Sequence, residues 1–96
     1  MPQPTSENPH RHGTDDLPCS FAQFLVSIGS SALVHLGELA DPGTGARTVD
    51  LVVASHSIQV LEVLKRKTVG NLDADESQLL DALLRDLHEK YAAARG

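Results

Sequence analysis

The stretch 64-LKRKTVGNLDADESQLL-80 decides the fold of this chain, because one helix ends in it and another begins. Its three successive cations, Lys65, Arg66 and Lys67, are suited to the last turn of a helix, where they complement the negative end of the helix dipole. Gly70 follows at the position where a residue in the left-handed conformation usually ends a helix. The first half of the stretch therefore predicts a helix terminus.

The second half of the same stretch predicts a helix start. Asp73 is followed three residues later by Glu76, which is the spacing of a capping box. A phosphate-binding loop would need a second glycine and a preceding strand, and the stretch has neither. We therefore interpret it as a corner between two helices, formed by Thr68, Gly70, Asn71, Asp73 and Glu76.

The helix before the corner is expected to begin near Thr48 or Asp50 and to end near Thr68. Its apolar residues recur at helical spacing over some 15 residues, which is longer than a typical strand. One apolar stripe consists of Leu51, Ala54, Ile58, Leu61 and Leu64, and it is widened by Val53, Val60 and Val63. The sequence thus predicts an amphipathic helix with a wide apolar face.

The helix after the corner starts at Asp73 and has a leucine-rich face. This face consists of Leu79, Leu80, Leu83, Leu84, Leu87 and Tyr91. On the opposite side, three oppositely charged pairs are spaced i,i+4: Asp81 with Arg85, Arg85 with Glu89, and Asp86 with Lys90. Such pairs mark a solvated face more than they stabilise it.

A further helix is expected from Ser20, with Gln23 completing a capping box. Its apolar spacing continues to Leu39, and Asp41, Pro42 and the residues up to Gly45 stop it. A second apolar row, formed by Val26, Leu33 and Val34, lies away from the first. A helix that is apolar on more than one side either runs through a bundle or meets another chain.

These elements predict an all-α fold of three antiparallel helices, as an up-down-up bundle or as a helical dimer. Residues 1–18 are polar and contain four of the five prolines, so we expect a disordered tail before a small helical domain over 19–96. A domain of this size buries only about 60% of the surface of its unfolded chain and is usually marginal alone. Association with a second copy or another partner is therefore expected.

Composition argues against several classes of function. The formal net charge of −5 repels a phosphate backbone, and two Phe and one Tyr without Trp provide no stacking platform for nucleic acid. Ser20 to Gly37 lack formal charge but contain several polar residues, which favours a helix buried among helices over a membrane span. No apolar signal segment precedes them. We expect a cytoplasmic protein that binds neither nucleic acid nor membranes.

Candidate chemical groups are few. One histidine falls in each expected helix, at His35, His56 and His88, and three imidazoles at one level would suit zinc. Apart from Glu38, three residues after His35, they have no His, Cys or carboxylate at i,i+3 or i,i+4, so separate structural roles are favoured. Cys19 has no base placed beside it, and the serines lack a nucleophile elbow. We predict no catalytic residues, no metal site and no cofactor.

Three segments resemble a bacterial family known as domain of unknown function 1844: 21-FAQFLVSIGSSAL-33, 33-LVHLGELADPGTG-45 and 61-LEVLKRKTVGNLDADESQLLDALLRDLHEKY-91. The most specific run is Lys-Thr-x-Gly-Asn-Leu at 67–72. The matching positions are Phe21, Leu36, Gly37, Pro42, Lys67, Thr68, Gly70, Asn71, Leu72, Glu76, Leu80, Leu84 and Tyr91. Gln59 departs from an expected Asp and His88 from a usual Arg, which puts any role of that acidic position in doubt.

The resemblance implies a function. The family member with an assigned role that the chain resembles is a polarity protein of gliding bacteria. This implies a non-catalytic module that acts with a response-regulator protein and promotes nucleotide exchange on a small Ras-like GTPase, at the cell poles through a partner. We expect Lys65, Arg66, Lys67, Val26, Leu33 and Val34 to bind partners. The alternative is an autonomous homo-oligomer with a structural or metal-linked role.

Overall fold

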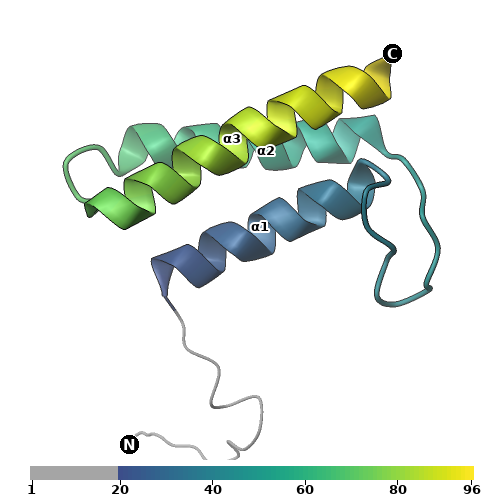
Figure 1. The fold of residues 1–96 in the computed structure, drawn as a ribbon, viewed down its shortest axis with the longest axis horizontal. Helices are drawn as coiled ribbons and strands as arrows, with labels where there is room; N and C mark the ends of the chain where they lie inside the picture. The colour runs from purple at the N-terminus through teal and green to yellow at the C-terminus, as the bar shows by residue number, and fades with distance from the viewer. Residues whose placement is uncertain (1–19) are drawn as a thin grey trace, which may run out of the picture.

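The computed structural model describes residues 20–96, which form three helices (Figure 1). They are α1 (Phe21–His35), α2 (Leu51–Lys67) and α3 (Ala74–Arg95). Each helix contacts the other two, and successive helices run in opposite directions, with α3 alongside α2 and α1 beneath both in Figure 1. The predicted all-α, up-down-up arrangement is confirmed for this part of the chain. The predicted tail, 1–18, lies outside the described residues.

Side chains at the predicted caps start all three helices. Ser20 Oγ accepts from the Gln23 backbone N–H at 3.1 Å, and Asp50 Oδ1 accepts from that of Val53 at 3.1 Å. At α3 the capping box is complete, whereas at α1 only the Ser20 bond is formed. These bonds satisfy backbone donors that a helix leaves unpaired in its first turn.

The expected continuation of α1 to Leu39 is wrong, because α1 ends at His35. Gly37 adopts φ +81° and donates its N–H to Val34 O at 3.1 Å, while Glu38 N–H reaches Leu33 O at 2.9 Å. This pair of bonds is a Schellman motif, which closes the helix with a left-handed glycine. A Cβ on Gly37 would lie 2.9 Å from Val49 Cγ2, so the close approach of the next segment also requires glycine.

The connection over residues 36–50 is longer than predicted and folds back on the end of α1. Leu36 forms an isolated antiparallel bridge with Val49, and Asp50 N–H donates to His35 O at 2.7 Å. The expected stop residues form a tight turn inside this loop, where Asp41 Oδ1 accepts from Gly43 N–H at 2.7 Å. The loop thereby brings the start of α2 next to the end of α1.

The core lies where the three helices meet and is entirely aliphatic. Its buried residues are Leu25, Ala32, Leu36, Ala54, Ile58, Leu61, Leu80, Leu84 and Leu87. Burial of each large side chain contributes roughly 1.5 to 3 kcal/mol from the hydrophobic effect. Phe21, Ile28 and Tyr91 are partly buried at its margin. Within residues 20–96 no helix has the length and hydropathy needed to cross a bilayer.

Candidate interaction surface

The corner between α2 and α3 is closed by its own polar groups. Thr68 Oγ1 donates to Leu64 O at 2.7 Å, and Gly70 follows with φ +85°. Glu76 N–H donates to Asp73 Oδ1 at 2.8 Å, and Glu76 Oε1 accepts from Asp73 N–H at 3.0 Å. Asn71 N–H donates to Thr68 O at 2.9 Å. The corner residues predicted from the sequence thus hold the corner together.

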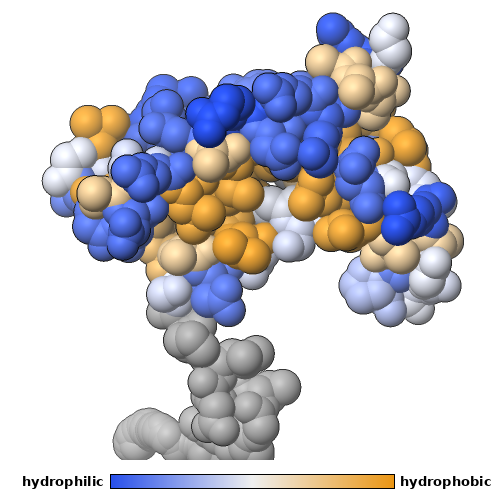
Figure 2. Space-filling view, viewed as in Figure 1, coloured by the Kyte–Doolittle hydropathy of each residue, from blue (hydrophilic) through white to orange (hydrophobic). Residues whose placement is uncertain are grey.

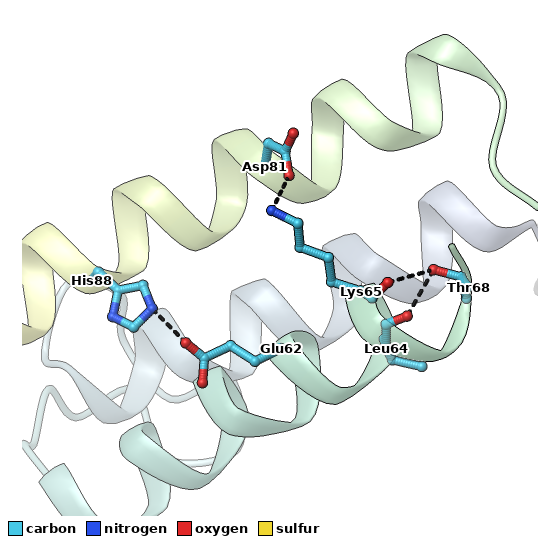
Figure 3. Close-up of polar contacts among 6 residues, drawn as sticks. All are labelled: Glu62, Leu64, Lys65, Thr68, Asp81 and His88. Carbon is cyan, nitrogen blue, oxygen red and sulfur yellow. Dashed lines mark hydrogen bonds and ion pairs between the residues drawn. The ribbon is translucent and has the colours of Figure 1, made fainter. Parts of the chain in front are cut away.

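Lys65 is not available as a free cation, because it joins α2 to α3 (Figure 3). Its Nζ lies 2.9 Å from Asp81 Oδ1. Both side chains are about half exposed, so the pair contributes little stability. Asp81 was expected to face Arg85 along α3, and it turns to α2 instead. Of the three expected i,i+4 pairs, Asp86 with Lys90 is the one that forms within residues 20–96.

Arg66 and Lys67 differ from Lys65. Both side chains are exposed, and neither has an ion-pair partner among residues 20–96. They stand at the C-terminal end of α2, where their charge complements the helix dipole. Among residues 20–96, the exposed cations of the corner without an ion-pair partner are therefore these two residues.

Two of the three histidines make separate contacts. His35 Nδ1 lies 2.8 Å from Ser31 O within α1, and His88 Nε2 lies 2.9 Å from Glu62 Oε2 of α2 (Figure 3). His56 is exposed on α2. Among the described residues no three His, Cys, Asp or Glu side chains gather to hold a metal ion. The metal-linked alternative therefore finds no site in this part of the chain, and Cys19 lies outside it.

Helix α1 exposes apolar side chains on both sides of its buried stripe. Leu25 is completely buried, yet its neighbours Phe24 and Val26 are 49% and 42% exposed. Successive helical residues are about 100° apart, so Phe24 and Val26 flank the buried side. The Phe21 and Phe24 rings lie 6.5 Å apart. The sequence indicated a second apolar side but did not identify Phe24 as exposed.

The three residues of the predicted second row of α1 lie in three different surroundings. Leu33 is half-buried and packs against the core, whereas Val34 lines a hollow of about 300 Å³ with His35, Asp41 and Pro42. Val26 is the exposed member of the row. The three residues therefore do not form one continuous docking patch.

A band of apolar residues runs between α1 and α3. Figure 2 shows it below the hydrophilic outer side of α3. Here the two helices approach closely, because buried Gly29 faces Leu83: a Cβ on Gly29 would be 3.1 Å from Leu83 Cδ2. Leu79 and Leu83 are only partly buried. The sequence could not show this band, since it depends on how two helices pack.

Lys90 is the cation on α3 whose titration the structure changes. Its Nζ donates to Asp86 Oδ1 at 2.9 Å, and this hydrogen bond, with the charge of Asp86, raises the pKa of Lys90 above its usual value. Glu38, in the loop after α1, and Glu89 act in the same direction, against a smaller effect of burial. Lys90 is thus held charged by a local network.

The outer side of α2 has exposed valines. The spacing in the sequence places two of them, Val53 and Val63, beside the apolar stripe that forms the core. Val52 is 81% exposed, and Val53 and Val63 are 38% and 42% exposed. Gln59, the position with an expected Asp in the family, lies on the same side and donates to Ser55 Oγ at 3.3 Å. The sequence did contain a signal for this exposed surface, because α2 has more valines than one neighbouring helix can cover.

Comparison with known proteins identifies the family. The family model described as domain of unknown function (DUF1844) matches residues 18–93. No curated protein and no solved structure matches the chain significantly. The family match includes α1, α2 and nearly all of α3. The resemblance seen in the 21–33, 33–45 and 61–91 segments is therefore confirmed, and the chain belongs to the DUF1844 family of domains of unknown function.

Proposed function

We propose that the chain is a non-catalytic protein-interaction module. The observation that carries the proposal is the exposure of Phe24 and Val26 on either side of fully buried Leu25. Exposed apolar side chains on α1 and exposed cations at the end of α2 are each typical of surfaces that bind other proteins. The hydrogen bonds of the corner stabilise the fold. We therefore assign the chain a role in binding other proteins.

The finer part of the proposal rests on resemblance to RomX, a polarity protein of gliding bacteria. On this basis the chain acts with a response-regulator protein and promotes guanine-nucleotide exchange on a small Ras-like GTPase, at the cell poles through its partner. An exchange factor needs no chemistry of its own, because it works by binding one conformation of the GTPase more tightly than the other.

The two exposed surfaces suit two different partners. The apolar side of α1, with Val26 and the adjacent band along Leu83, suits the response regulator, since apolar burial gives stable association. Arg66 and Lys67 suit acidic residues of the GTPase, because exposed charges mainly accelerate and orient an encounter. Lys65 is left out of this surface because its ammonium group is paired with Asp81.

Nucleotide exchange tests the proposal directly. A Ras-like GTPase loaded with fluorescent nucleotide is mixed with the chain, with the response regulator, and with both. The expected result is faster nucleotide release in the mixture that contains both proteins. Release that stays at its basal rate in every mixture, with no co-elution of the chain with either protein, contradicts the proposal.

A further inference from the structure

The outer side of α2 carries an apolar row that the fold itself does not use. We call this row the α2 seam; it consists of Val53, His56, Val60 and Val63. Its spacing of three, four and three residues is that of the core positions of a coiled coil. From α2, the core takes Ala54, Ile58 and Leu61, with Leu51 and Leu64 packed against it. The seam valines are outside both sets, so this apolar row of α2 is not part of the core formed by residues 20–96.

The shape of the surface around the seam is suited to packing against another helix. Two shallow hollows, of about 380 and 240 Å³, are both lined by His56 and Gln59. The first extends to Val52 and the second to Val63. His56 and Gln59 therefore stand as a ridge between two grooves. Helices pack by inserting such ridges into the grooves of their neighbours.

The charges at the two ends of the seam complement each other. Positions 51–61 contain no acidic or basic residue apart from His56. Asp50 lies at the N-terminal end of α2 and Lys67 at the C-terminal end, and neither has an ion-pair partner within residues 20–96. An antiparallel second copy of α2 brings each Asp50 to the end of the other helix that carries Arg66 and Lys67. A parallel copy instead places like charges together.

The apolar positions fit the same antiparallel arrangement. With the two-fold axis near position 58, Val53 faces Val63 of the second copy, and His56 faces Val60 of the second copy. One patch then complements itself, as a two-fold interface requires. We propose that the α2 seam is the interface of an antiparallel homodimer of this chain. The dimer leaves α1 exposed for the response regulator of the proposed function.

The size of the seam sets the expected strength of the dimer. A helix of 17 residues is about 26 Å long at about 1.5 Å per residue. Its face is smaller than the roughly 800 Å² per partner of a standard stable interface. The dimer is therefore reversible, and its population rises with protein concentration.

Sedimentation of the full chain over a wide concentration series tests the interface. The mass is expected to rise from monomer to dimer for the wild type and for Val69→Glu, and to stay at the monomer for Val63→Glu. Val69 is the matched control, because it is a 78% exposed valine outside the seam. Circular dichroism verifies that both variants are folded. A monomer at every wild-type concentration, or a dimer that Val63→Glu leaves intact, overturns the proposal.

Cross-linking tests the antiparallel direction, in a Cys19→Ser background that removes the native thiol. An oxidised mixture of Val53→Cys and Val63→Cys chains is expected to give the mixed disulfide, since facing positions meet the short span that a disulfide needs. Val53→Cys alone is expected to remain uncross-linked. Efficient self-cross-linking of Val53→Cys overturns the antiparallel arrangement.

If the seam binds a different protein instead of a second copy, the experiments with Val63→Glu give a different result. Val63→Glu then lowers binding of the response regulator without changing the mass of the chain alone, and this outcome also overturns the homodimer. The mass is measured on the isolated chain. A dimer without exchange activity therefore contradicts only the proposed function, and exchange activity from a strict monomer contradicts only the dimer.

Discussion

Lys65 Nζ lies 2.9 Å from Asp81 Oδ1 and connects the last turn of α2 to α3 (Figure 3). The two residues are 16 positions apart in the sequence, and the corner between them brings their side chains together. This contact changes the interpretation of the cationic run. One of its three charges is paired within the fold, and the proposed function assigns the other two to a partner.

We predict that Asp81→Asn lowers the free energy of unfolding by less than about 1 kcal/mol, because both members of its pair with Lys65 are about half exposed. The loss should shrink further at high salt, which screens exposed charges. Urea unfolding followed by circular dichroism measures both effects. A loss of several kcal/mol that salt does not change would show that the pair is not a surface ion pair.

The capping box of α3 is expected to matter more than this ion pair. Asp73→Ala removes the acceptor of the Glu76 N–H bond, and loss of an N-cap costs about 0.5–2 kcal/mol. Asp75→Ala is the matched control, since Asp75 is an acid in the same first turn but not the cap. Thermal and urea unfolding should rank Asp73→Ala as the less stable variant. Equal stabilities would contradict the capping role.

Close approach of α1 and α3 predicts a steric effect at Gly29. Gly29→Val places its side chain against Leu83, which lies 3.1 Å from the Cβ position, and overpacking typically costs about 1–3 kcal/mol. Ser30→Val puts the same residue on the exposed side of α1 and is expected to change the free energy of unfolding by roughly 0.5 kcal/mol or less. Similar stabilities for the two variants would mean that the helices are further apart.

Arg66 provides a prediction on partner binding. Arg66→Glu is expected to slow association with the GTPase, more at low salt than at high salt, because an exposed charge acts mainly on the rate of encounter. Arg85→Glu makes the same charge change on the outer side of α3, away from the corner. Stopped-flow binding at several ionic strengths compares the two. Equal slowing would indicate an effect of net charge alone.

Local signals made most of the fold predictable. Asp73, Glu76 and Gly70 act through bonds and dihedral angles within a few residues of themselves, so the sequence was sufficient to locate the corner. The end of α1 was missed because the apolar spacing continues to Leu39, while Gly37 ends the helix through its backbone. Competition between a side-chain pattern and a backbone motif is not visible in spacing alone.

The candidate surface was less predictable, because it depends on packing between helices. Apolar spacing indicated that Val53 and Val63 share a helix face with core residues, but it did not show that the core ends before them. Likewise, the i,i+4 pattern placed Asp81 with Arg85, whereas the corner places it beside Lys65. Exposure and long-range pairing are properties of the assembled helices.

The most direct test of the interaction module is the affinity of the response regulator for α1 variants of the full chain, measured by isothermal titration calorimetry. Val26→Gln is expected to weaken binding at least tenfold, and Val69→Gln, the control at a more exposed valine of the corner, to leave it unchanged. Binding should also show a negative heat-capacity change from apolar burial. Undiminished affinity of Val26→Gln, or no binding by the wild type, would contradict the account.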